Sequence, residues 1–226
     1  MGVVSSVELD LPIFPLSNVV LFPRIQCPLH LFEPRYRQMA EHALARDRRL
    51  GMVAVRTEHV HDMAGDPAVF PVGCAGVITE EQQLPDGRYN IVLVGTFRFR
   101  ILHEPERPAE QLYRVARVER LEDIFPPQEA SRVGELRARV IDLAGDLARR
   151  IAPGRSTRIS ADRFAGIDDA ALVNALANAF PFPPPEKQGL LEADSIPERY
   201  ERLESVLRFQ LAEALCPPAP GSGRLQ

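Results

Sequence analysis

The sequence has no tryptophan and a single lysine, Lys187, so the other 26 of its 27 basic residues are arginines. Lysine-dependent chemistry therefore has one candidate. Lys187 follows three prolines and Glu186, which is typical of an exposed first helical turn. No Gly-Lys dipeptide occurs, which excludes the phosphate-binding loop GxxxxGK[ST], and no buried lysine is evident for a Ser-Lys dyad. We therefore expect no ATPase or peptidase activity.

The sequence also has no strong excess of either charge, no closely spaced cysteine pair and no long apolar run. The net charge is −4, with 27 basic and 31 acidic residues spread over both halves, so we do not expect a nucleic-acid partner. Cys27, Cys74 and Cys216 lie far apart and form no CxxC pair, which favours reduced thiols and a cytoplasmic location. No run of 18 apolar residues occurs, so we expect no membrane span.

The chain is organised around residues 11–52. Three short apolar runs broken by proline predict strands at residues 13–16, 19–22 and 28–32. A helix is predicted at residues 34–46, because the apolar period changes from two to 3.6 there and Pro34 suits a first turn. Its apolar face comprises Tyr36, Met39, Ala40, Ala43 and Leu44.

The segment up to residue 122 alternates in the manner of strands. Further strands are predicted at residues 52–55, 69–79, 89–102 and 113–121. Gly73 and Gly76 interrupt one of them and indicate a bend, and Asp86-Gly87 indicates a turn. Five or six strands with one helix predict a small, closed or nearly closed barrel.

The rest of the chain is helical in pattern. Helices are predicted near residues 133–147, 170–179 and 186–193, and a capping box, Ser195-Ile196-Pro197-Glu198, predicts the start of a last helix. The expected fold class is thus α+β. The expected domains are a barrel over residues 11–122 and a helical domain over residues 127–215, with flexible termini at residues 1–10 and 216–226.

Several motifs carry a resemblance to a known family. They are Phe14-Pro15-Leu16, Val20-Leu21-Phe22-Pro23, the run from Pro28 to Tyr36, Gly51-Met52, Val72-Gly73, Val94-Gly95 and the run from Lys187 to Glu192. Over residues 11–213 the chain resembles the Lon protease N-terminal (substrate-binding) domain, without the ATPase and protease domains. The resemblance implies a PUA-like β-barrel with one embedded helix, followed by a helical bundle.

The resemblance also implies a function. It implies a non-enzymatic module that binds unfolded or specific client polypeptides, by strand addition to a barrel edge and by apolar contacts, as an adaptor or chaperone-like factor. No cofactor is expected. The identity of the client and the oligomeric state are left open.

Five residues form the predicted peptide site: Phe32, Glu33, Arg35, Tyr36 and Arg98. Tyr36 supplies apolar area and Arg35 a bidentate donor, while Arg98 lies on the strand face opposite Phe97. The competing interpretation is that Glu33 and Arg35 only fix the start of the helix.

Three alternatives are weighed against this site. An RNA-binding role rests only on PUA-like fold analogy. His59 and His61 form an HxH that two-residue spacing would bring to one strand face, but without a third ligand it predicts no metal site, and a hydrolase built on this loop lacks a nucleophile motif. His30, on an apolar strand, is interpreted as a core or barrel-mouth histidine.

Overall fold

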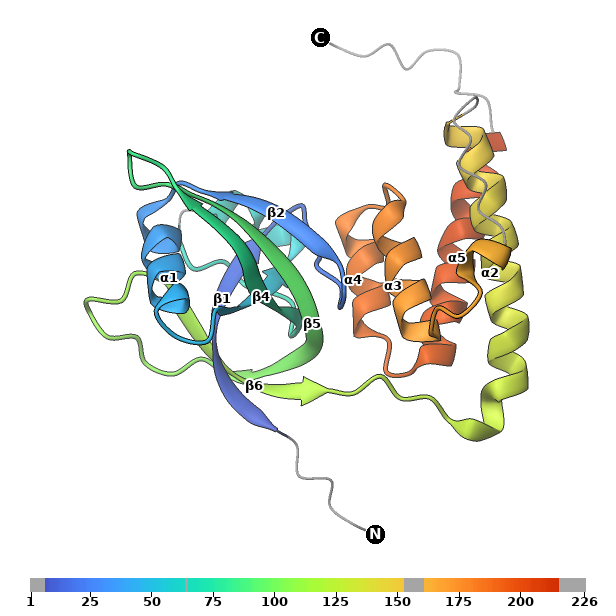
Figure 1. The fold of residues 1–226 in the computed structure, drawn as a ribbon, viewed down its shortest axis with the longest axis horizontal. Helices are drawn as coiled ribbons and strands as arrows, with labels where there is room; N and C mark the ends of the chain where they lie inside the picture. The colour runs from blue at the N-terminus through green and yellow to red at the C-terminus, as the bar shows by residue number, and fades with distance from the viewer. Residues whose placement is uncertain (1–6, 64, 153–160, 216–226) are drawn as a thin grey trace. The chain divides into compact units, whose positions relative to one another are not determined.

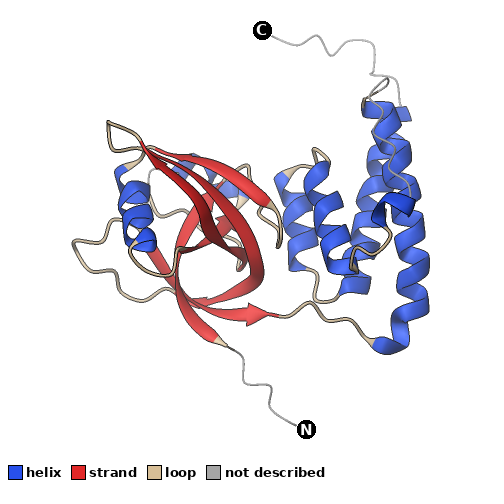
Figure 2. Ribbon diagram, viewed as in Figure 1, coloured by secondary structure: helices blue, strands red, loops and turns tan. Residues whose placement is uncertain are grey.

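The computed structural model describes residues 7–63, 65–152 and 161–215. They belong to two compact units (Figure 1). The first comprises Met1–Asp123 and Asn174–Glu192, and the second comprises Ile124–Val173 and Ala193–Gln226. The first unit holds the sheet, and the second is helical (Figure 2). Residues 174–192 thus group with the sheet, although they fall within the expected helical domain.

A six-stranded sheet forms the first unit, in the order β2-β5-β4-β3-β1-β6. The strands are β1 (Glu8–Leu16), β2 (Gln26–Leu31), β3 (Arg49–Ala54), β4 (Val72–Gln83), β5 (Tyr89–His103) and β6 (Arg114–Leu121). β1 and β3 pair in parallel, and the other pairings are antiparallel. β6 pairs with β1 and also with β5, so the sheet curves back on itself. Among the described strands, β2 pairs only with β5 and is an edge strand.

β5 is the longest strand, with 15 residues, and it contacts most of the sheet. Its register with β4 shifts at Ala75/Gly76 and again at Ile78/Glu80. Such bulges bend a strand and let it curve around a core. At Gly95, β5 passes close to the loop between β1 and β2, and a Cβ there would stand only 2.1 Å from the carbonyl oxygen of Phe22.

The core of the first unit lies on the inner side of this curved sheet. The buried side chains that pack together there are Leu11, Ile13, Val53, Ala75, Phe99, Ala116 and Val118. Each large aliphatic or aromatic side chain buried in this way contributes roughly 1.5–3 kcal/mol to stability. The helix α1 (Pro34–Leu44) begins with a proline, as predicted, and buries Tyr36, Met39, Ala40 and Ala43. Tyr36 packs on Phe14, with ring centroids 4.4 Å apart.

Two local predictions in the N-terminal stretch are wrong. Residues 19–22 form no strand, although Val20, Leu21 and Phe22 are buried. The segment ends in a tight turn, in which Ile25 N–H donates to the Phe22 carbonyl at 3.2 Å, so its apolar side chains fill the core from a loop. β1 also begins at Glu8, inside residues 1–10 that were expected to be loose, because Glu8–Ile13 pairs with β6.

The second unit contains two long helices side by side, α2 (Ala130–Ile151) and α5 (Ile196–Leu215) (Figures 1 and 2). α3 (Asp169–Ala179) begins in this unit. Arg137 donates to Asp169 at 2.8 Å, and the buried Tyr200 hydroxyl donates to the same carboxylate at 2.8 Å. Burial, together with that hydrogen bond, raises the pKa of Tyr200. The predicted capping box is present, since Glu198 N–H donates to Ser195 Oγ at 3.3 Å.

Two features of composition have structural counterparts. Cys27 and Cys74 are free thiols, as expected, and Cys216 lies outside the described residues. None of the helices that the structure describes combines the length and the apolar character needed to cross a bilayer.

Candidate functional site

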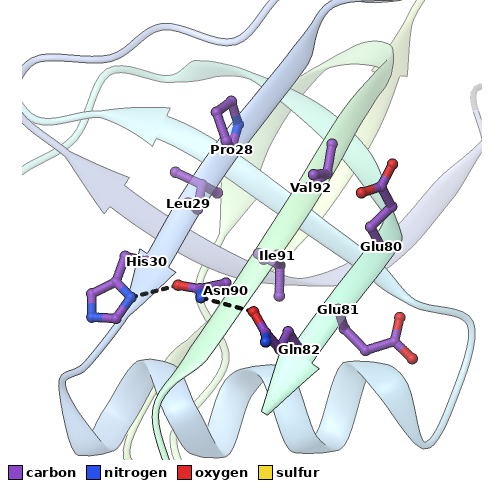
Figure 3. Close-up of a pocket in the computed structure, with 9 residues that line it drawn as sticks. All are labelled: Pro28, Leu29, His30, Glu80, Glu81, Gln82, Asn90, Ile91 and Val92. Carbon is purple, nitrogen blue, oxygen red and sulfur yellow. Dashed lines mark hydrogen bonds between the residues drawn. The ribbon is translucent and has the colours of Figure 1, made fainter. Parts of the chain in front are cut away.

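A hollow of about 400 Å³ lies on the first unit, over the strands β2, β5 and β4 (Figure 3). It is lined by Pro28, Leu29, His30, Glu80, Glu81, Gln82, Asn90, Ile91 and Val92. The register brings these residues into rows, because Pro28 and Glu80 both pair with Val92, and His30 and Gln82 both pair with Asn90. Directly paired residues present their side chains on one face of a sheet.

The row formed by His30, Asn90 and Gln82 is polar, and we call it the polar ladder. His30 Nδ1–H donates to Asn90 Oδ1 at 2.7 Å, and Asn90 Nδ2 donates to Gln82 Oε1 at 3.2 Å (Figure 3). Arg88 Nη1 lies 3.4 Å from His30 Nε2. The ladder fixes the orientation of three exposed polar side chains. His30 is therefore an exposed, hydrogen-bonded member of this row, which excludes the core half of its interpretation as a core or barrel-mouth histidine.

The row formed by Pro28, Val92 and Glu80 carries apolar surface and one carboxylate. Pro28 is exposed and Val92 is half-buried, so both offer apolar surface to a ligand. Glu80 is exposed at the β4 end of this row. Within residues 7–63, 65–152 and 161–215, no cation forms an ion pair with Glu80, whereas Glu81 is paired with Arg48.

Phe32 extends this surface beyond β2. Its side chain is 59% exposed, and its ring stacks on His30 with centroids 6.2 Å apart. We call the outward-facing set Pro28, His30, Phe32, Glu80, Gln82, Asn90 and Val92 the open face. It combines an apolar floor, oriented hydrogen-bonding groups and an exposed aromatic ring, which are the components of a polypeptide-binding groove.

Arg35 and Glu33 have a different environment at the start of α1. The Arg35 guanidinium donates to the carbonyls of Met63 and Gly65, and its Nε donates to Glu33 at 2.9 Å. It also lies over the Tyr36 ring, 4.6 Å from the centroid. Arg35 thus ties the helix to the segment that follows the 3-10 helix Thr57–Asp62.

Tyr36 is 5% exposed, so its ring faces the core rather than a ligand in this structure. Burial raises the pKa of its hydroxyl. Of the residues predicted around the helix start, Phe32 and Glu33 are the ones that remain accessible, Phe32 most of all.

Arg98 is the fifth predicted residue, and it is 2% exposed. It lies on the outer side of β5, where α4 (Pro184–Glu192) covers it. Its guanidinium donates to the Leu191 carbonyl at 2.9 Å, to the Glu122 carbonyl at 3.0 Å and to Asp123 at 3.0 Å. These contacts hold α4 on the sheet, and they separate Arg98 from the open face at the other end of β5.

Most of the open face was missed by reasoning from the sequence. A signal was present, because the alternation of residues 89–102 assigns Asn90 and Val92 to one face, and Pro28 marks β2 as an edge strand. What could not be read was the register that brings Glu80 and Pro28 to opposite sides of Val92. Of the HxH pair, the side chain of His61 lies outside the described residues, and the described residues contain no cluster of three metal-ligating side chains.

Comparison with known proteins identifies the class of this fold. The family model of the ATP-dependent protease La (LON) substrate-binding domain matches residues 10–208. The chain therefore belongs to the Lon substrate-binding domain family.

Among its relatives are two bacterial Lon proteases. Lon protease 1 of Syntrophobacter fumaroxidans is 28% identical over 207 residues, which are 91% of this chain and 24% of that protein. The Lon protease of Escherichia coli K12 is 26% identical over 209 residues, which are 91% of this chain and 25% of that protein. The chain thus spans about a quarter of the length of the curated relatives it matches.

Two solved structures share the fold. The N-terminal domain of a Mycobacterium avium complex Lon protease superposes with a TM-score of 0.63 at 16% identity, over 88% of this chain and 98% of that one. A Lon N-terminal domain protein from Xanthomonas campestris superposes with a TM-score of 0.56 at 22% identity, over 89% of this chain and 98% of that one.

Proposed function

We propose that this protein is a non-enzymatic module that binds unfolded or specific client polypeptides through the open face. The observation that carries the proposal is membership of a substrate-binding domain family over residues 10–208. The match is to that domain and not to a protease or ATPase domain. Within a cell such a module would act as an adaptor or chaperone-like factor, presenting a client without cleaving it.

The open face supports this proposal by its chemistry. An exposed aromatic ring beside a shallow apolar hollow offers contact area for side chains of many sequences, and aromatic residues dominate binding energy at such surfaces. The polar ladder can hydrogen-bond a peptide backbone without requiring a particular side chain.

The edge strand of the sheet affects how a client would bind. We infer a PUA-like barrel from the pairing of β6 with both β1 and β5, with β2 as the remaining edge. Strand addition to that edge was the mode expected from the resemblance. Pro28 removes a backbone donor in the middle of β2, which weakens strand addition there, so we propose side-chain contacts on the open face as the main mode.

Binding to a permanently unfolded chain tests the proposal. A fluorescent, reduced and carboxymethylated polypeptide is titrated with the protein and followed by anisotropy. We expect Phe32→Ala to weaken binding by about fivefold or more, as for an aromatic hot spot. The matched control is Phe209→Ala on α5, which removes an equally exposed ring, 55% against 59%, from the other unit.

Equal binding by wild type, Phe32→Ala and Phe209→Ala would remove the open face from the proposal. A single-stranded RNA of about 20 nucleotides serves as a second probe. Sub-micromolar RNA affinity at physiological salt, falling steeply as salt rises, would favour the nucleic-acid alternative.

A further inference from the structure

The hollow carries an unbalanced charge, and this points to a class of polypeptide. We propose that the hollow takes an extended segment in which a lysine or arginine stands two positions from an apolar residue, with the cation at Glu80 and the apolar side chain over Pro28 and Val92. This inference rests on the proposed function, and it names the kind of client that the open face prefers.

The geometry follows from the register of three strands. Pro28 and Glu80 pair with Val92 from its two sides. Neighbouring strands lie about 4.8 Å apart, so Pro28 and Glu80 are separated by about 10 Å across the sheet. In an extended segment, side chains two positions apart point to the same side and lie about 7 Å apart. An apolar side chain that covers Pro28 and Val92 therefore places the side chain two positions away within reach of the Glu80 carboxylate.

The charges around the hollow single out Glu80. Glu81 also lines the hollow, but its carboxylate is paired with Arg48. On the opposite side, Arg88 is paired with Asp86 at 2.6 Å, and that ion pair holds the pKa of Asp86 below its ordinary value. Glu80 has no such ion pair within the described part of the chain. The hollow therefore presents one uncompensated negative charge beside its apolar floor.

The polar ladder reinforces this selection. Asn90 already donates to Gln82 and accepts from His30, so the ladder brings orientation without charge. A cationic side chain meets one attractive partner at Glu80, a neutral side chain meets none, and an acidic side chain meets repulsion from Glu80. Selectivity for cations is thus set by a single exposed carboxylate, and it is modest in size.

Three labelled peptides test the inference. They share the sequence Gly-Ser-Leu-Phe-X-Val-Gly-Ser, with lysine, norleucine or glutamate at X, and their affinities are measured by anisotropy at low ionic strength. We expect wild type to bind the lysine peptide about two- to fivefold more tightly than the norleucine peptide, the effect of one exposed ion pair, and the glutamate peptide more weakly than both. The lysine preference should shrink at high salt.

Two variants locate the effect. Glu80→Gln should bind the lysine and norleucine peptides equally. The matched control is Glu8→Gln on β1, an exposed strand carboxylate in the same unit but outside the hollow, which should keep the wild-type preference.

The outcomes separate this inference from the proposed function. Equal binding of the lysine and norleucine peptides by wild type, or a preference that survives in Glu80→Gln, would overturn the inference and leave polypeptide binding standing. Failure of all three peptides, and of the unfolded polypeptide, to bind would overturn both.

Discussion

The two halves of β5 differ in what lies against their outer side. At Asn90 and Val92 the outer side is accessible and forms the floor of a hollow. At Arg98 the outer side is covered by α4, and the arginine is fully engaged. One strand therefore provides a binding surface at its start and a structural anchor near its end. An outward-facing cation on a strand indicates a site only where no other element covers it.

The largest expected effect on stability comes from the half of β5 that α4 covers. Arg98→Ala should lower the free energy of unfolding by about 3 kcal/mol, because it leaves the Leu191 carbonyl and Asp123 without their donor in a buried setting. Asp123 is 28% exposed, which keeps the expected cost at the lower end for a broken buried pair. Urea denaturation measures it.

The control for Arg98 is Arg88, which precedes β5 at its open end and pairs with an exposed aspartate. Arg88→Ala should leave the free energy of unfolding almost unchanged, because both members of this pair are exposed to water. If Arg98→Ala proves as mild as Arg88→Ala, the contrast between the two halves is wrong.

The next effect concerns Gln188 on α4. Its side-chain amide donates to the Val72 carbonyl at 3.0 Å and is 2% exposed. Gln188→Ala should cost roughly 1–3 kcal/mol, since a buried carbonyl loses its donor. Gln82→Ala removes the same chemical group from the open face and should be close to neutral. Similar costs for the two glutamines would mean that α4 does not cover the sheet as described.

Arg35 lies at the border of the open face, and Arg35→Ala should have an intermediate effect on stability. Loss of the bonds to the Met63 and Gly65 carbonyls should lower the free energy of unfolding by about 1–2 kcal/mol and speed amide hydrogen exchange after residue 57. Glu33→Gln keeps both carbonyl bonds and should cost less than about 0.5 kcal/mol. A neutral Arg35→Ala that weakens polypeptide binding as much as Phe32→Ala would extend the open face to Arg35.

Asn90→Ala should have the smallest effect on stability, below about 0.5 kcal/mol, because its bonds to His30 and Gln82 are exposed to water. It should still weaken binding of the unfolded polypeptide, since the ladder loses its central member. Thermal melts and anisotropy on the same preparation check both halves of this expectation. A loss of stability with unchanged affinity would make the ladder structural.

Much of the fold was predictable because it depends on local patterns. The alternation of residues 89–102, the helix beginning at Pro34 and the cap at Ser195 each depend on neighbours within a few residues. Residues 19–22 were mispredicted because burial and strand pairing are separate properties, and an apolar run shows only the first. The likeness to the Lon N-terminal domain, carried by short motifs, is confirmed by the family match.

The site was less predictable, for a physical reason. Alternation correctly set Arg98 on the face opposite Phe99, which is in the core, but the residue that covers it, Leu191, lies 93 positions away. Likewise, Glu80 meets Val92 only after a bulge at Ile78/Glu80 shifts the register. Contacts of this kind depend on tertiary packing, so Phe32 is the one predicted residue that lies on the open face.

Backbone amide chemical shifts compare the two halves of β5 in one titration. The ¹⁵N-labelled protein is titrated with the lysine peptide. We expect shifts at residues 28–32, 80–82 and 90–92, with residues 97–99 and 188–191 unchanged. Shifts concentrated at residues 97–99 and 188–191, with the open face unaffected, would contradict this expectation.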